Sequence, residues 1–329
     1  MTAETGPGVV ERVEGARRRG SAGGRAPALE DASVVAPGPE HADSVTDPAS
    51  RAARAVCRIC PHACAPAEGR HGICRARVAR GGEVACENYG RVTSLALDPV
   101  EKKPLARWRP GALVLSAGSY GCNLRCPFCQ NAEIACAGEG DVAWRALEPA
   151  ELVALAAEAR PRGCVGIAYT YNEPFVGFEF VRDTARLARE AGLANVVVSN
   201  GMVNPGPLAE VLPYLDAANI DLKGFTRDFY DLVGGDLGTV KETIAALSAC
   251  PTCHVEVTTL VVPGLNDDAA EIDAAAAWLA SLDPAIPYHL TRFFPCHRMA
   301  DRAPTPVSTL RELAAVARRH LDDVLLGNC

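Results

Sequence analysis

The sequence predicts an α/β fold: a partial (β/α)6 TIM-like barrel, preceded by a small cysteine-rich, metal-binding module and a disordered amino-terminal arm. Three observations predict it. From Ala112 onward, short apolar segments alternate with longer segments rich in Ala, Leu and Glu, which is typical of βα units and a parallel sheet. Cysteines crowd between Cys57 and Cys74, and residues 1–50 consist mainly of Ala, Gly, Pro, Glu and Asp. We therefore divide the chain into residues 1–50, 51–110 and 111–329.

The first two parts differ sharply in composition. Residues 1–50 contain almost no aromatic or large apolar side chains that could anchor a core, so we expect a disordered arm. From Cys57 to about Trp108 the chain is cysteine-rich and basic, with short strand-like pieces such as Arg91–Leu97. This composition predicts a small module that is held together by a metal.

The barrel core begins with a strand expected over Leu113–Gly118. The later apolar segments are the other expected strands: Val165–Thr170, Asn195–Ser199, Ala217–Leu222, His254–Val262, Tyr288–Phe293 and, more weakly, Val324–Gly327. The helices expected between them include Pro149–Arg160, Phe178–Ala191 and Asp267–Ser281. Five crossovers of similar length, without a second glycine-rich cofactor fingerprint, favour a six-stranded partial barrel over a Rossmann sheet. Residues that directly follow each strand are then the site candidates.

Charge and composition narrow the functional class. A net charge of -7 and a pI near 5.6 give no general basic field, so a protein that mainly binds nucleic acid is not expected. No segment reaches the roughly 18 to 20 consecutive apolar residues of a membrane span. The chain start lacks an apolar signal core, so we expect a cytoplasmic protein with reduced thiols. In that setting, 14 cysteines at short spacings indicate metal or cluster ligands before disulfides.

A cysteine motif follows the first expected barrel strand. Cys122, Cys126 and Cys129 form the pattern CxxxCxxC on a loop, with Phe128 before the last cysteine. Three thiolates can hold a cubane of four irons and leave the fourth iron free for another ligand. A zinc site is the alternative, but zinc sites usually close with four protein ligands, and only Cys136 lies nearby as a fourth. The motif therefore favours a [4Fe-4S] cluster.

With these motifs the chain resembles the radical S-adenosylmethionine superfamily, in its branch similar to pyruvate formate-lyase activating enzyme. It looks most like the radical enzymes of the AmmeMemoRadiSam system. The resemblance runs from Cys57 to about Asn328. It rests on these segments: CxxCPHxCxxxxGxxGxC (57–74), NYGxVxSxAxDPxEKKPL (88–105), SxGxxGCNxRCPFCQN (116–131), GIAYTYNEP (166–174), NxDLKG (219–224), EVTTLxxPGLND (256–267) and RFFP (292–295).

The resemblance implies the chemistry. Cys122, Cys126 and Cys129 would act as the catalytic cluster ligands, and the [4Fe-4S] cluster would reductively cleave S-adenosylmethionine into methionine and a 5′-deoxyadenosyl radical. That radical would abstract a hydrogen atom from a substrate. An electron donor such as flavodoxin or ferredoxin is implied.

It also implies which strand ends bind S-adenosylmethionine. Asn172 and Glu173 would accept hydrogen bonds from its amino group, although an ordinary turn before Pro174 is the alternative. Ser199 and Asn200 would bind polar groups of the methionine or the ribose.

Three further cofactor contacts are implied on later strands. Asp221 suits a hydroxyl or ammonium group and Lys223 suits the carboxylate, unless the two form a plain salt bridge. Val262 begins a segment that resembles the adenine-stacking part of the family, with a proline-led turn as the alternative. His289 and Arg292 lie on the last clear strand, where either could meet substrate, although a lone barrel His is more often a core residue.

The amino-terminal module has four closely spaced thiols, with glycines that permit tight turns. They are Cys57, Cys60, Cys64 and Cys74, and His62, His71 and Cys86 lie nearby in sequence. Four soft ligands suit either a closed zinc site or an auxiliary iron–sulfur cluster. We favour zinc slightly, because no redox partner for a distant second cluster is evident.

Three functions stay open at this point. The first is a modifier of a small molecule, peptide or nucleic acid, acting with Memo-type and AMMECR-type partner proteins. The second is an activase that places a radical on a glycyl-radical enzyme. The third is a non-catalytic zinc-binding interaction module. Relatives commonly continue into a further cysteine-containing tail, whereas this chain ends at Cys329, so we expect the contribution of that tail to be missing.

Overall fold

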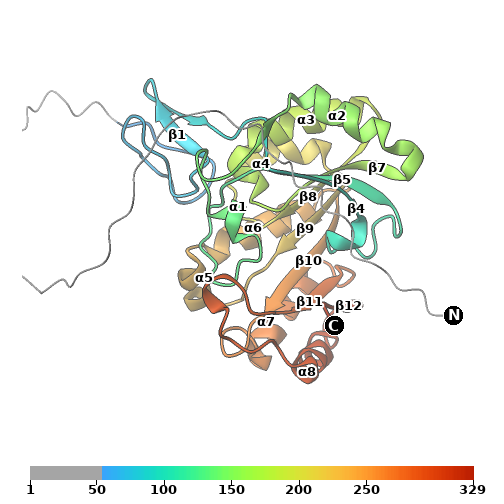
Figure 1. The fold of residues 1–329 in the computed structure, drawn as a ribbon. Coiled ribbons are helices and arrows are strands. Elements are labelled where there is room, and N and C mark those ends of the chain that lie inside the picture. The colour runs from blue at the N-terminus through green and yellow to red at the C-terminus, as the bar shows by residue number, and fades with distance from the viewer. Residues whose placement is uncertain (1–53) are drawn as a thin grey trace, which may run out of the picture.

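An eight-stranded sheet is the frame of the protein (Figure 1). The computed structural model describes residues 54–329, so the arm expected over residues 1–50 lies outside the described residues. Seven parallel strands follow the chain order across the sheet: β5 (Leu113–Gly118), β7 (Cys164–Tyr169), β8 (Ala194–Ser199), β9 (Ala217–Asp221), β10 (His254–Val261), β11 (Tyr288–Arg292) and β12 (Val324–Gly327). The antiparallel strand β4 (Ser94–Pro99) adds the eighth at the edge beside β5. Because β4 and β12 do not pair with each other, the barrel is partial.

Helices connect the parallel strands and pack on the outside of the sheet (Figure 1). They are α2 (Pro149–Glu158), α3 (Phe178–Glu190), α4 (Pro205–Val211), α5 (Arg227–Val233), α6 (Leu237–Ser248), α7 (Ala269–Leu282) and α8 (Val307–Ala317). Helix α2 packs against β5 and β7, α3 against β7 and β8, and α8 against β11 and β12. The buried apolar residues between these helices and the sheet form the main core.

Local sequence signals explain where the helices begin. At α2, Glu148 and Glu151 form a reciprocal capping box with Pro149 in the first turn. At α7, the Asp268 carboxylate accepts hydrogen bonds from the N–H groups of Ala270 and Glu271. These caps satisfy backbone donors that a helix start otherwise leaves unpaired, so they fix where α2 and α7 begin.

Smaller elements precede and flank the sheet. They are the hairpin of β1 (Arg77–Arg80) and β2 (Glu83–Cys86), the pair of β3 (Arg91–Val92) and β6 (Arg145–Ala146), and the short helix α1 (Ala132–Ala135). No helix in the described part of the chain is long and apolar enough to cross a membrane.

The structure confirms the predicted α/β class and the order of the barrel strands. One element lies elsewhere than expected. The segment Arg91–Leu97, read as a strand-like piece of the cysteine-rich module, is split between β3 and β4, and β4 pairs with β5 in the main sheet. The edge of β5 would otherwise be unpaired, and β4 satisfies its backbone groups. Strand β4 therefore extends the barrel sheet by one antiparallel strand, whereas β1–β2 and β3–β6 form separate two-stranded sheets.

Candidate active site

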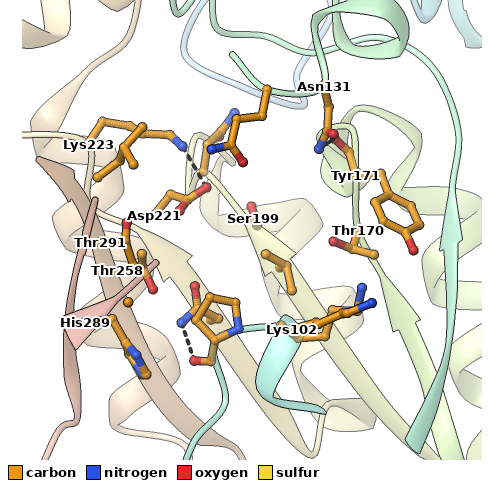
Figure 2. A pocket seen from close by; sticks show the side chains of 18 of the residues that line it. Lys102, Asn131, Thr170, Tyr171, Ser199, Asp221, Lys223, Thr258, His289 and Thr291 are labelled. Carbon is orange, nitrogen blue, oxygen red and sulfur yellow. Dashed lines mark hydrogen bonds and ion pairs between the residues drawn. The ribbon is translucent and has the colours of Figure 1, made fainter. Parts of the chain in front are cut away.

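A cavity of about 860 Å³ lies against the inner face of the sheet (Figure 2). Its wall comes from residues 99–106, from the loop after β5, and from strands β8 to β12 with the loops that follow β7 and β9. Nine residues expected to bind the cluster or S-adenosylmethionine line it: Cys122, Cys126, Cys129, Asn172, Glu173, Ser199, Asn200, Asp221 and Lys223. The structure thus brings together residues that are up to about a hundred positions apart in the sequence.

Three cysteines of the loop after β5 face this cavity, and we call Cys122, Cys126 and Cys129 the loop cysteines. Asn172 helps to position this loop. Its Oδ1 accepts the N–H of Ser119 at 2.9 Å, and its Nδ2 donates to the carbonyls of Tyr120 and Gly121 at 3.1 Å. The amide of Asn172 is therefore engaged with the backbone, unlike the expected contact with an amino group.

The setting of the loop cysteines suits an iron–sulfur cluster. Two N–H donors approach the Cys122 sulfur, from the Leu124 backbone at 3.4 Å and the Asn200 side chain at 3.5 Å. Burial raises the pKa of all three thiols, for Cys126 to about 11, while the nearby Lys223 ammonium opposes the rise at Cys126 and Cys129. Bound iron would deprotonate them outright. Three soft ligands on one loop, open on one side to a cavity, fit a cluster with one exchangeable position.

Glu173 joins the ends of β7 and β8. Its carboxylate accepts hydrogen bonds from the Ser199 hydroxyl at 2.8 Å, the Asn200 N–H at 2.8 Å and the Phe175 N–H at 2.9 Å. Burial raises the pKa of Glu173 to about 7, although these donors oppose the rise. A cationic ammonium in the cavity would favour the ionised form further.

Asp221 and Lys223 form an ion pair of 2.7 Å at the end of β9 (Figure 2). Burial disfavours the charged form of Lys223, but the Asp221 carboxylate outweighs this and raises its pKa. The pair therefore is a salt bridge, as the alternative held, and both side chains also line the cavity.

Val262 does not line the cavity. Its side chain is fully buried, and its N–H donates to the Asn266 side chain at 2.7 Å. Leu260, two residues earlier, faces the cavity instead.

The side-chain amide of Asn200 is already hydrogen-bonded within the protein. Its Nδ2 contacts the Cys122 sulfur at 3.5 Å and the Asn123 Oδ1 at 3.0 Å.

The floor of the cavity contains residues that the sequence reasoning missed. Residues 99–107 pass beneath it, where the Pro104 carbonyl accepts from Asn219 Nδ2 at 2.8 Å. The Glu256 carboxylate accepts the N–H groups of Ala106 and Arg107 at 3.0 and 2.7 Å. Lys102 and Asn219 line the cavity here. Both belong to segments quoted for the family resemblance, so the motifs marked the region but not the side chains.

The four module cysteines, Cys57, Cys60, Cys64 and Cys74, lie together in a second place. The Cys57 N–H donates to the Cys64 carbonyl at 2.8 Å, and the Ile73 N–H points at the Cys64 sulfur at 3.4 Å. Cys57, Cys60 and Cys74 are more than 90% buried, and none of the four lines the cavity. Burial raises the pKa of Cys60 to about 11.

The nearby histidines of the module are engaged elsewhere. His62 Nε2 donates to the Asn123 carbonyl at 2.8 Å, and His71 Nε2 lies 2.6 Å from a Glu87 carboxylate oxygen. Across residues 54–329, no group of three or more His, Cys, Asp or Glu side chains is arranged so that it could hold a metal ion. A metal at the module cysteines, like a cluster at the loop cysteines, therefore stays a prediction.

The module touches the loop that carries the loop cysteines. His62 binds the carbonyl of Asn123, which directly follows Cys122. Gly121 has a φ of +89°, and a Cβ there would lie 2.5 Å from the Cys74 carbonyl oxygen. Glycine is required because any side chain would collide with the module backbone. The two cysteine sets are thus on adjoining segments rather than distant ones.

Comparison with known proteins gives consistent matches. A family model described as the radical SAM superfamily matches residues 117–277. An uncharacterised protein of Methanocaldococcus jannaschii is 39% identical over 275 residues, which is 83% of this chain and 80% of that protein. The isethionate sulfite-lyase activating enzyme of Nitratidesulfovibrio vulgaris is 29% identical over 167 residues, which is 48% of this chain and 54% of that enzyme.

A solved structure shows a likeness of fold. It is the crystal structure of a radical SAM methyltransferase from Sphaerobacter thermophilus, with a TM-score of 0.51 at 18% identity and with 67% of each chain covered. The chain spans about half the length of the isethionate sulfite-lyase activating enzyme.

Proposed function

Because the chain belongs to the radical S-adenosylmethionine superfamily, we propose that its cavity binds S-adenosylmethionine beside a cluster held by the loop cysteines. Enzymes of this superfamily use a [4Fe-4S] cluster and S-adenosylmethionine, so the chain is an enzyme with these cofactors rather than a non-catalytic zinc-binding module. When bound, the cluster supplies the electron for reductive cleavage of S-adenosylmethionine, which starts hydrogen abstraction from a substrate. The observation that carries the proposal is that all three loop cysteines and the polar strand ends face one cavity.

The strand-end residues offer groups of opposite charge to the two charged groups of the cofactor's methionine part. Glu173 offers a buried carboxylate for the ammonium group of the cofactor, and Ser199 and the Asn200 backbone hold that carboxylate in place. Lys223 offers the cation for the cofactor carboxylate, and Asp221 keeps it charged. Asn172 and the Asn200 side chain act as positioning groups for the cysteine loop, because their amides already bond to it.

We assign Val262 a structural role and not the expected contact with adenine. Its buried side chain supports the β10 end, and the neighbouring Leu260 supplies the apolar surface that adenine would contact. An apolar wall near the base excludes water from the cofactor.

The module cysteines would hold their own metal, zinc or an auxiliary iron–sulfur cluster. Their burial away from the cavity supports a closed, structural site. The contacts of His62 and Cys74 with the loop support a role in bracing the segment that carries Cys122.

The substrate and partners follow from the motif resemblance. The AmmeMemoRadiSam-type motifs favour a modifier that acts with Memo-type and AMMECR-type proteins, and a flavodoxin or ferredoxin would deliver the electron. An activase is the second candidate, supported by the 29% identity to an activating enzyme. A neighbouring gene for a glycyl-radical enzyme would favour the activase, and Memo-type neighbours would favour the modifier.

The experiment is anaerobic reconstitution with iron and sulfide, followed by reduction with dithionite and addition of S-adenosylmethionine. We expect an iron–sulfur absorption band and formation of 5′-deoxyadenosine and methionine. Equal turnover by a variant with all three loop cysteines changed to Ala would refute the assignment of the cluster to this loop.

A further inference from the structure

The inner faces of β9, β10 and β11 are polar beneath the cysteine loop, although barrel interiors are usually filled with branched apolar residues. The strand register places Asp221, Thr258 and His289 side by side in one row across the three strands. Asn219 lies two residues before Asp221 on the same face, and all four line the cavity. A polar row that faces a cavity can bind a ligand, which a packed core cannot.

Two of these side chains have buried polar atoms without a partner. Asn219 is 0% exposed and Thr258 is 5% exposed, yet within residues 54–329 neither Asn219 Oδ1 nor Thr258 Oγ1 has a hydrogen-bond partner. The Asn219 amide cannot simply turn over, because its Nδ2 donates to the Pro104 carbonyl. Buried polar atoms are normally hydrogen-bonded, so these two indicate a place for a ligand that bonds to them.

His289 adds an oriented acceptor to this row. Its Nε2 lies 2.5 Å from Glu256 Oε2. Burial opposes ionisation of Glu256, but hydrogen bonds from His254, His289 and two backbone N–H groups outweigh it and lower its pKa to about 2. An ionised carboxylate requires Nε2 of His289 to donate. Donation from Nε2 leaves Nδ1 as the ring nitrogen that can accept, and His289 lines the cavity.

Lys102 adds a positive charge to the floor. The nearby Asp98 carboxylate is already engaged by Lys103 at 2.9 Å and by the Tyr171 hydroxyl at 2.7 Å. Lys102 Nζ lies farther from it, at 3.4 Å, and its side chain is 56% exposed. Figure 2 shows Lys102 and His289 on one side of the cavity and Lys223 on the other. Lys102 is therefore a second cation, separate from the one assigned to the cofactor.

We propose that Lys102, Asn219, Thr258 and His289 form a substrate subsite for a small molecule that carries a carboxylate or phosphate group together with hydroxyl donors. Lys102 binds the anionic group, and Asn219 and His289 accept from the hydroxyls. The subsite rests on the proposed function, because it deepens the account of the same cavity.

The fixed floor and the size of the cavity support a small molecule over a protein segment. Residues 104–107 are fastened beneath the cavity through Asn219 and Glu256, so this segment forms a fixed wall on that side. A volume of about 860 Å³ must hold the cofactor as well, and single ligand pockets commonly span roughly 300 to 1,000 Å³. The remaining space suits a ligand of metabolite size.

The test is calorimetric titration of the oxidised, cluster-loaded protein, saturated with S-adenosylmethionine. Ribose 5-phosphate and gluconate are the anionic probes, and ribose is the neutral one. We expect at least one anionic probe to bind at least tenfold more tightly than ribose, and comparison of the two anionic probes identifies phosphate or carboxylate as the preferred group. Binding of neither anionic probe, or equal binding of ribose, would overturn the proposal.

Two variants assign the binding to the subsite. Lys102→Met should weaken binding of the anionic probe at least tenfold. The matched control Lys241→Met changes a lysine on α6 outside the cavity lining, and it should leave probe binding unchanged. Thr258→Val should weaken binding of the anionic probe by several-fold. The substitution removes an unpaired buried hydroxyl without changing the shape of the side chain, so the melting temperature should stay unchanged or rise. Unchanged probe affinity in both variants would overturn the subsite. Failure of the wild-type protein to bind S-adenosylmethionine would instead contradict the proposed function.

Discussion

The module cysteines and the loop cysteines carry the same ligand atoms in opposite surroundings. Three of the four module thiols are more than 90% buried and none faces the cavity, whereas all three loop thiols face it. The module set has four potential ligands and the loop set has three. Closed sets of four are typical of structural metals, and open sets of three leave a position for another molecule. Ligand number and access, rather than ligand type, therefore distinguish the proposed structural site from the proposed catalytic one.

The distance between the two cysteine sets bears on the identity of the module metal. On sequence alone, no redox partner is evident for a distant second cluster, which favours zinc slightly. The structure places the module against the loop through His62 and Gly121, so distance no longer favours zinc over an auxiliary cluster. Metal analysis has to decide between them.

The largest expected effect is the loss of one metal without the other. Changing all three loop cysteines to Ala should remove the four irons of the cavity cluster and leave the module metal in place. The reason is that the two ligand sets share no residue. Iron, zinc and sulfide analysis of the purified variant measures this, with Cys250→Ala/Cys329→Ala as the control for cysteine loss. Residual zinc supports a structural site, residual iron with sulfide supports an auxiliary cluster, and no residual metal contradicts a module metal.

The converse change should affect stability most. Cys57→Ser/Cys60→Ser should remove the module metal, because metal binding energy at such a site is also folding energy. A loss of about 3 kcal/mol would lower the Tm by roughly 6 to 12 °C for a domain of this size. Differential scanning calorimetry checks this against the matched Cys250→Ser/Cys329→Ser variant. An unchanged Tm would show that the module needs no metal for its stability.

The next prediction concerns the cavity residues at the strand ends. Glu173→Ala and Lys223→Ala should each weaken S-adenosylmethionine binding while both metals remain. Loss of a hydrogen bond to a charged group costs about 1.5 to 3 kcal/mol, or roughly ten- to a hundred-fold in affinity. Equilibrium binding to the oxidised protein measures the change, with exposed Glu242→Ala and Arg227→Ala as charge controls. Wild-type affinity in both cavity variants would make these residues structural.

The smallest effect concerns the contact between the two regions. His62→Ala removes the hydrogen bond to the Asn123 carbonyl, which is worth about 0.5 to 1.5 kcal/mol. We expect the Tm to fall by roughly 1 to 6 °C with the module metal retained. Loss of the module metal in this variant would show that His62 is a metal ligand and not a brace.

Much of the barrel could be predicted because its signals are local. Strands such as β5 (Leu113–Gly118) are short, largely apolar runs, and several connecting helices begin with a capping side chain, such as Asp268 at α7. The placement of β4 could not be predicted, because pairing with β5 depends on which edge is unpaired in the folded sheet. Periodicity within Arg91–Leu97 holds no information about that partner.

The candidate site shows the same division. The loop cysteines and Glu173 could be found because they follow strands within dense motifs. Val262 was expected to begin the adenine-stacking segment but is buried outside the cavity, because it follows the end of β10 at Val261 and its N–H is held by the Asn266 side chain. Asn219 and Lys102 were missed because Asn219 lies within β9 and Lys102 in the short turn before the barrel, so neither directly follows a predicted strand, and only the folded sheet brings both to the cavity.

The most direct test of the account is the electron paramagnetic resonance spectrum of the reduced protein before and after addition of S-adenosylmethionine. The account predicts a cluster signal that changes on addition in the wild-type protein, because the loop cluster has an open position facing the cavity. The variant without the loop cysteines should show no signal that responds, even if the module holds iron. A responsive signal in that variant, or an unresponsive wild-type cluster, would contradict the placement of the chemistry at Cys122, Cys126 and Cys129.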